Sequence, residues 1–455
     1  MNSYNGKIVF FSALIAGCSG LLFGFDTGII ADTQWQLSSQ FHFNHFQWSL
    51  VVSSMIAGAF LGALSSSHAV EKFGRKQALR LTAALFIIGT ILVATTHGFS
   101  CLFWGRFILG ISIGISAYCA PLLISEIAEE HQRGRYVLIN NIGITGGEAL
   151  AFFLGYMLQD YAHDSWRLMF FLGILPALFL LIGIQFIPQS PRWLLKKGHT
   201  QAALNVLIKL RNNDLSKAQH ELNTIRNNLH RYQEPPSLFQ KPFLKIVMMG
   251  ATLGFLQQAA GINTIMYYGP YIFNNVGFTP TQSLLATFVM GIFNTLFTVF
   301  AMLMVDKIGR KKLLFRGSFV CGLALLLLAQ ANHFSAYGHW IAFFSIFIYI
   351  MAFAVSLGSM FWLLIAEIYP LQIRAKAMSF TSSVQWLANF LVSFAFLPLT
   401  DTLGSNTTMM LLAFFCFTTV LFTYLFVPET KGVSLEKIEQ NLFSGMKLKA
   451  LGAPQ

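Results

Sequence analysis

The chain has 455 residues, of which 55% are hydrophobic and only 11% are charged, and its mean hydropathy is +0.60. A soluble domain carries about 25% charged residues, so this composition excludes a soluble globular protein and indicates a polytopic membrane protein. The net charge of +12 does not indicate nucleic-acid binding, because the basic residues gather in short connections between apolar runs, as the positive-inside rule describes.

Apolar runs long enough to cross a bilayer recur along the whole chain and predict about twelve helices of roughly 20 residues each. Counted from the N-terminus, the even-numbered connections hold Lys and Arg, whereas the odd-numbered ones hold none apart from Arg167 at a span boundary. We therefore expect both termini on the cytoplasmic side. The runs lie near residues 8–30, 48–70, 78–97, 102–124, 137–157, 167–187, 244–268, 284–305, 313–332, 340–366, 377–399 and 409–427.

One long polar stretch, residues 192–242, falls between the sixth and seventh runs. Helical patterns at 201–211 and 215–232 precede two prolines, Pro235 and Pro236, and their charges are interpreted as a solvated face. The stretch divides the chain into two groups of six spans. The predicted domains are an N-terminal six-helix bundle at 1–190, a cytoplasmic helical linker at 191–242, a C-terminal six-helix bundle at 243–432 and a cytoplasmic tail at 433–455.

One carboxylate, Asp26, interrupts the first apolar run, in the stretch GLLFGFDTGII at 20–30. An ionised Asp in such a run costs a few kcal/mol or more, so it is usually present for function. Arg106 in the fourth run is predicted to lie at a similar depth, where the two charges neutralise each other. We interpret Asp26 as a proton acceptor and Arg106 as the charge that tunes it. Two plainer interpretations are that Asp26 ends the helix at the membrane surface and that the pair is a static tie.

The two halves of the chain repeat three short phrases at an offset of about 240 residues. Such parallel repeats are typical of transporters with a central substrate site near the bilayer midplane. The phrases are EKFGRK at 71–76 and DKIGRK at 306–311, ISEI at 124–127 and IAEI at 365–368, and Ile187-Pro188 and Val427-Pro428.

These phrases resemble the sugar porter family of the major facilitator superfamily, from the first span to PETKG at 428–432. The resemblance implies an all-α, polytopic major facilitator fold, with twelve transmembrane helices in two six-helix halves and a cytoplasmic helical linker. The short external loops and tail look most like the bacterial proton-linked galactose, arabinose and xylose transporters. Further matches are Gly105-Arg106, PQSPR at 188–192, Gln257-Gln258, Gly261, Asn263, Tyr267-Tyr268, Gly358, Trp362, Glu367, Arg374, Gln385, Trp386 and Asn389.

Amide and aromatic side chains in the seventh, tenth and eleventh spans suit a sugar, because hydroxyls take bidentate amide contacts and a sugar ring packs on an aromatic face. A helix weakened by glycine in the seventh span lets Asn263 turn inward. For any single residue the alternative is hydrogen bonding between helices. The predicted substrate-binding residues are Phe23, as a wall near Asp26, with Asn141, Glu148, Gln257, Gln258, Asn263, Tyr267, Gly358, Trp362, Gln385, Trp386 and Asn389.

The fifth span departs from the family pattern. Asn141 stands where many sugar porters have Gln, and Glu148 stands where relatives have an apolar residue or Gln. Glu148 is interpreted as an added sugar contact, an alternative proton site or a protonated bystander. In the tenth span, Ser359 replaces a family proline.

Charged residues at the cytoplasmic ends of the spans are predicted to form a cytoplasmic gate, in which opposite charges from both halves close the inner mouth while the outer one is open. The plainer alternative is that they only orient the loops. The expected pairs are Glu71 with Arg75, Glu126 with Arg133, Asp306 with Arg310 and Glu367 with Arg374.

The sequence thus predicts proton-coupled symport of a hexose or pentose by alternating access, by a monomer in the bacterial inner membrane. Its partners are a monosaccharide, a proton and the lipid bilayer. A facilitative uniporter is the nearest alternative, although uncoupled members need no carboxylate at position 26, and a sugar receptor without transport would have a longer tail. No nucleotide loop, metal-ligand cluster or nucleophile triad is present, so we expect no enzyme activity, cofactor, metal or nucleic acid.

Overall fold

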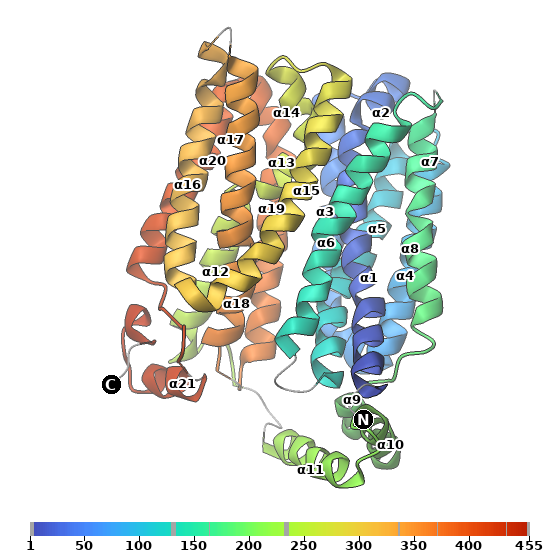
Figure 1. The fold of residues 1–455 in the computed structure, drawn as a ribbon, viewed down its shortest axis with the longest axis vertical. Helices are drawn as coiled ribbons and strands as arrows, with labels where there is room; N and C mark the ends of the chain where they lie inside the picture. Colours follow the sequence, from blue (N-terminus) through green and yellow to red (C-terminus); the bar gives the residue numbers. More distant parts are fainter. Residues whose placement is uncertain are drawn as a thin grey trace. The chain divides into compact units, whose positions relative to one another are not determined.

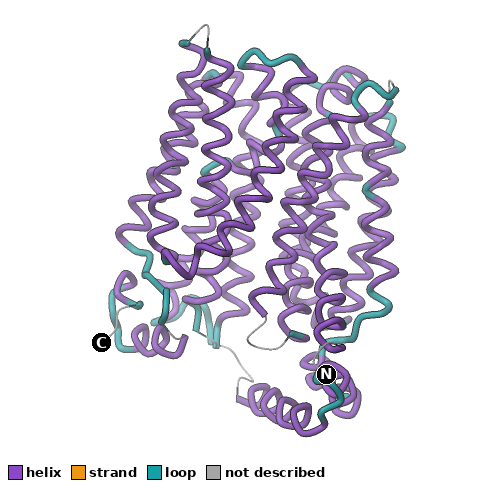
Figure 2. The backbone as a smooth tube through the Cα atoms, viewed as in Figure 1, coloured by secondary structure: helices purple, strands orange, loops and turns teal. Residues whose placement is uncertain are grey.

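The computed structural model describes residues 4–128, 133–162, 164–231, 236–334, 337–370, 372–433 and 435–452, and these residues form helices and no strand (Figure 2). The all-α prediction is confirmed. Eleven of the described helical segments are long and apolar enough to cross a membrane. A further helix, α6 (Arg133–Leu158), is long enough as well, but Asn140, Asn141 and Glu148 lower its hydropathy. It stands where the fifth span is predicted.

By its internal contacts the chain forms two compact units, each assembled from several segments. The first unit comprises Met1–Asp26, Ala57–Glu148 and Arg167–Pro235. The second comprises Thr27–Ile56, Ala149–Trp166 and Pro236–Gln455. The predicted domain boundaries at residues 190 and 242 follow the sequence repeat rather than these contact-based units, and they remain a prediction.

The first half of the chain contains long membrane helices that Figure 1 shows in blue to green. Helices α1 and α6 pack backbone to backbone within the first unit: a Cβ at Gly24 would lie 1.8 Å from the carbonyl oxygen of Ile144. Only glycine permits this approach. Helix α4 packs against α5 and α8. The bounds are α1 Tyr4–Asp32, α2 Gln34–Phe41, α3 His45–Phe73, α4 Arg75–Ala94, α5 Phe99–Ile127, α7 Ser165–Leu172 and α8 Ile174–Gly183.

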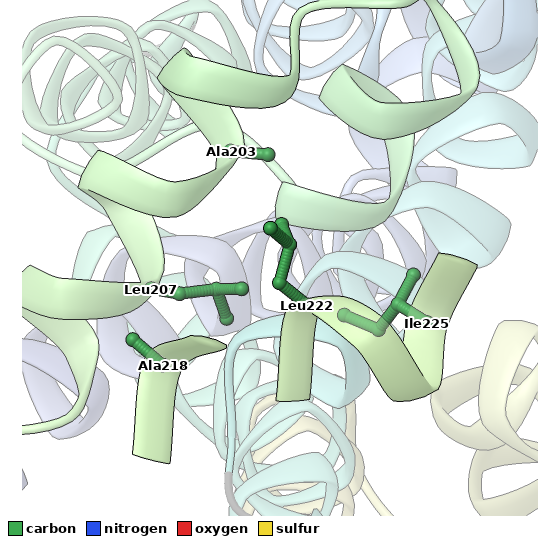
Figure 3. Close-up of a cluster of buried hydrophobic side chains, with 5 residues drawn as sticks. All are labelled: Ala203, Leu207, Ala218, Leu222 and Ile225. Atoms are coloured by element: carbon green, nitrogen blue, oxygen red, sulfur yellow. The ribbon is translucent and has the colours of Figure 1, made fainter. Parts of the chain in front are cut away.

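The polar linker folds into three short helices, α9 (Pro191–Lys196), α10 (Thr200–Leu210) and α11 (Leu215–Arg231). The structure confirms the two helical patterns there. Figure 3 shows the small apolar core between α10 and α11, made by Ala203, Leu207, Ala218, Leu222 and Ile225. The polar faces of both helices are left to solvent, as the amphipathic pattern requires.

In the second half of the chain, two membrane spans are interrupted near polar residues. The seventh span ends as α12 (Phe243–Ala259) and resumes as α13 (Ile262–Tyr267) after Gly261, whose φ of +91° favours glycine. The tenth span passes from α17 (Gly338–Phe353) through a π-helical turn at Ala354–Gly358 into α18 (Ser359–Ile368). The remaining helices are α14 Gly269–Asn275, α15 Pro280–Ile308, α16 Arg310–Gln330, α19 Arg374–Leu403, α20 Ser405–Leu425 and α21 Leu435–Phe443.

The described part of the predicted tail packs onto the second unit rather than extending away from it. Helix α21 contacts α18, and Leu451 is fully buried. The Asn441 side chain donates a hydrogen bond of 2.8 Å to the Leu451 carbonyl, and the Lys449 ammonium lies 4.3 Å from the centre of the Tyr424 ring.

The two copies of the sequence repeat make equivalent hydrogen bonds at the start of α4 and at the start of α16. Both helices begin after a glycine of positive φ, Gly74 (+85°) and Gly309 (+100°). The Lys76 ammonium donates to the Ile187 carbonyl at 3.0 Å, and the Lys311 ammonium donates to the Val427 carbonyl at 2.6 Å. Each lysine therefore ties its helix to the chain that follows the last span of its own half.

The two copies differ in the side chain that caps the helix. Glu429 accepts hydrogen bonds from the backbone N–H groups of Arg310 and Lys311, at 3.0 and 3.2 Å. Gln189 occupies the matching position in the first half and accepts from the N–H of Lys76 at 3.2 Å. A carboxylate at a helix N-terminus gains from the helix dipole, which a neutral amide does not.

We therefore expect Gln189→Glu to stabilise the protein by about 0.5 kcal/mol, because it adds an anion at the N-terminus of α4. The reverse change, Glu429→Gln, should lower stability by a similar amount. The measurement is the melting temperature of the purified protein, and equal melting temperatures for the two variants would contradict the argument.

Candidate functional site

The Asp26 carboxylate on α1 and the Arg106 guanidinium on α5 form an ion pair inside the first unit. The Arg106 Nη1 atom donates to Asp26 Oδ1 at 3.0 Å, and the exposed fractions of the two side chains are 0% and 2%. Asp26 Oδ2 has no hydrogen-bond partner among the described residues. The carboxylate thus keeps one oxygen that can take a proton while the other holds the arginine.

Three further predicted residues of the first unit stand on α1 and α6, and Glu148 lies where these two helices touch. Glu148 is 4% exposed, and its backbone nitrogen would lie 2.8 Å from a Cβ at Gly24, two residues before Asp26. Phe23 and Asn141 are both half-buried. The structure therefore places Glu148 beside the segment of α1 that carries Asp26.

In the second unit, predicted amides from the seventh and eleventh spans form one connected chain of hydrogen bonds. Asn263 donates to Gln258 at 2.9 Å, and both Gln258 and Gln385 donate to the side-chain oxygen of Gln257. Gln257 in turn donates to the Leu357 carbonyl at 3.0 Å. The break at Gly261 allows Asn263 to turn back toward Gln258.

The eleventh span also carries two other predicted residues. Asn389, 2% exposed, accepts a hydrogen bond of 3.1 Å from the Ser393 hydroxyl, and Trp386 is 7% exposed. Tyr268 stacks on Phe396 at 5.1 Å and donates to the Ser393 carbonyl. The neighbouring ring, Tyr267, is fully buried.

The tenth span holds its predicted residues around the π-helical turn. Gly358 ends that turn, and the Ser359 hydroxyl donates to the Ala354 carbonyl at 2.7 Å. Ser359, which replaces the family proline, thus satisfies a backbone oxygen at the point where the helix changes its winding. Trp362 is 37% exposed and its ring contacts Phe361 edge to face at 5.0 Å.

One pair of the predicted cytoplasmic gate, Glu71 with Arg75, differs from the sequence expectation. Arg75 forms a two-point contact with Glu126, at 2.7 and 2.8 Å, instead of pairing with Glu71. Glu71 binds Lys196 of the linker at 2.9 Å. The reason is the turn at Gly74, which starts α4 and directs Arg75 toward α5, on which α4 packs.

The second half repeats this arrangement. Arg310 binds Glu367 at 2.9 and 3.3 Å, as Arg75 binds Glu126 in the first half. The Arg374 Nε atom donates to the Tyr369 carbonyl at 3.1 Å. The side chains of Arg133 and Asp306 lie outside the described residues. Two contacts were missed by sequence reasoning, Lys196 with Glu71 and the Thr430 hydroxyl with Glu367, because their partners are far apart in the chain.

Membrane-spanning helices, a twofold internal repeat and a buried ion pair together define a multi-pass membrane transporter. Comparison with known proteins identifies its family: residues 12–442 match the family described as "Sugar (and other) transporter". The chain is 37% identical to the galactose-proton symporter of Escherichia coli strain K12, over 99% of this chain and 97% of that protein. It is 36% identical to the arabinose-proton symporter of the same strain, over 97% and 95%.

Solved structures agree with the sequence relatives. The inward-open xylose transporter XylE from E. coli matches with a TM-score of 0.83 and 30% identity, over 95% of this chain and 99% of that one. XylE bound to 6-bromo-6-deoxy-D-glucose, described as a major facilitator superfamily proton:xylose symporter, gives the same TM-score over 96% and 99%. The chain belongs to the sugar porter family of the major facilitator superfamily, as its motifs predicted.

Because the pair of Asp26 and Arg106 is buried, we expect Arg106→Met to destabilise the protein by about 3–5 kcal/mol, since it leaves a carboxylate without its partner. Adding Asp26→Asn should recover part of that loss. Melting temperatures of the single and double variants measure both effects, with Arg226→Met on the exposed face of α11 as the control. An Arg106→Met protein that melts like the parent would show that the pair does not carry this energy.

Proposed function

We propose that this transporter moves a monosaccharide into the cell together with a proton, by alternating access. The observation that carries the proposal is the fully buried contact of 3.0 Å between Arg106 and Asp26. A carboxylate inside the membrane that faces an arginine can exchange that partner for a proton and stay neutralised, while the released guanidinium turns to water or to another acceptor. The names of the relatives, symporters of galactose, arabinose and xylose with protons, support the same reading.

The proposed sugar site lies among the buried amides and aromatic rings. The chain from Asn263 to Gln385 offers both amide donors and amide oxygens, which hexose and pentose hydroxyls require. The residues proposed to complete the sugar site are Phe23, Asn141, Tyr267, Gly358, Trp362, Trp386 and Asn389. The proposed cytoplasmic gate uses two ion pairs, Arg75 with Glu126 and Arg310 with Glu367. Their pairing inside each half favours a gate that stiffens each half separately.

The proposed orientation places both termini in the cytoplasm of a bacterial cell, with the protein acting as a monomer in the inner membrane. The distribution of Lys and Arg supports this orientation. The proton gradient then supplies the driving force, about 2.3 kcal/mol per 100 mV and about 1.4 kcal/mol per pH unit for each proton. A facilitative uniporter would leave that force unused.

Asp26→Asn should abolish accumulation of sugar against its gradient while exchange of labelled for unlabelled sugar continues, because the amide cannot bind the coupled proton. The measurement is uptake of a radiolabelled hexose and pentose panel into vesicles, with and without an imposed pH gradient. In the parent, sugar addition should make the external medium more alkaline. Full concentrative uptake by the variant would overturn the coupling role and favour the uniporter.

We place the coupling proton on Asp26 and treat Glu148 as a sugar contact. Glu148→Gln should therefore keep gradient-driven accumulation, while KM changes by about tenfold at most, since an amide retains hydrogen-bonding capacity. The same vesicle assay reports both quantities. Loss of accumulation with exchange intact in this variant would move the proton site to Glu148.

A further inference from the structure

A second buried acid, Asp32, lies on the same helix as Asp26 and has no part in the proposed mechanism. It is the last residue of α1 and is 5% exposed, within the second unit. In the proposed orientation it stands near the outer surface. Because Asp32 is buried, the question is whether its carboxyl group is ionised or protonated.

No described group donates a hydrogen bond to the Asp32 side chain. Neither of its carboxylate oxygens has a hydrogen-bond partner among the described residues. Gln34, two residues later, is also 5% exposed, and its side-chain oxygen likewise accepts no hydrogen bond from the described part of the chain. A buried anion without donors is unfavourable, whereas a neutral carboxyl group is tolerated.

The end of α1 disfavours a negative charge for a second reason. The last carbonyl groups of a helix carry a partial negative charge. Two of them, those of Ile29 and Ile30, accept hydrogen bonds from the Thr33 hydroxyl at 2.9 and 3.3 Å, so the local donor is already used. An ionised Asp32 would add its charge at this negative pole.

Gly155 on α6 leaves the space that the carboxyl group occupies. A Cβ at Gly155 would lie 1.9 Å from Asp32 Oδ2, so any larger residue would displace the acid. The described elements beside it offer no compensating cation: α2 has no titratable side chain, and the outer turns of α6, from Ala149 to Leu158, contain only Tyr156. The packing fits a protonated carboxyl group.

We propose that Asp32 is a second proton-binding site, which takes a proton from the outer solution before the end of α1 packs against Gly155. This inference rests on the proposed function for its place in the transport cycle: the proton at Asp32 is additional to the coupled proton at Asp26. Packing of the outer end of α1 then depends on external acidity. An alkaline outer solution ionises Asp32 and opposes that packing.

Infrared spectroscopy tests the charge of Asp32 directly, without any transport assay. The full-length Asp26→Asn protein at neutral pH is compared with the Asp26→Asn/Asp32→Asn protein. The second substitution should remove a band of a protonated carboxyl group. An unchanged band in that region, with loss of a carboxylate band instead, would show that Asp32 is ionised and would overturn the proposal.

Sugar exchange in vesicles tests the role of that proton. In the Asp26→Asn parent, exchange should fall several-fold as the external solution is changed from mildly acidic to mildly alkaline. The Asp26→Asn/Asp32→Asn protein should lose this dependence, because Asn is neutral at every pH. Asp160→Asn, an exposed acid in the turn after α6, should retain it.

Two results of the exchange assay would overturn the proposal: a parent whose exchange is already independent of external pH, and a double variant that keeps the dependence. Failure of the proposed function looks different, because it appears as concentrative uptake by Asp26→Asn alone. The infrared comparison is unaffected by that outcome, so the two failures are distinguishable.

Discussion

The constraint on which the structure depends is the cost of a charge inside the membrane. Asp26 and Arg106 are both at least 98% buried, and each is acceptable there because the other is present. Their contact joins α1 to α5, while the glycines of α1 bring α6 against the same helix. Any step that binds a proton at Asp26 removes the charge that holds Arg106, so the chemistry of the site and the packing of three helices are linked.

The repeated inner ends show how one arrangement serves both halves. In each half a glycine turn starts a helix, an arginine of the first turn binds a glutamate of another span, and a lysine ties the helix to a backbone carbonyl. These contacts are made by charged side chains at the ends of the apolar spans, where specific hydrogen bonds, rather than hydrophobic burial, fix the positions of the helices. All these contacts form within one half of the chain.

The sequence predicted the parts of this structure that follow from local pattern. Hydropathy gave the membrane helices, amphipathic spacing gave α10 and α11, and the glycine at 261 indicated the break in the seventh span. It did not predict the partner of Arg75. Glu71 is nearer in the chain, but the direction in which Arg75 points depends on the backbone at Gly74 and on the packing of α4 against α5. Nor did hydropathy indicate that the segment ending at Leu451 would pack on the rest of the second unit, because α21 is a short helix that buries only a few apolar side chains, among them Ile438 and Leu442.

Asp26 and Asp32 show why hydropathy alone cannot assign a role to an acid in a membrane helix. The two residues stand six positions apart on α1, so the helix turns them toward different faces. One face carries a guanidinium and the other a glycine of α6. An acid with an arginine partner is held as an anion until the partner is exchanged, whereas an acid packed on glycine at a helix C-terminus is held as a neutral group until water reaches it. The identity of the facing residue, which only the fold specifies, separates the carboxylate proposed to couple transport from the one proposed to respond to the outer solution.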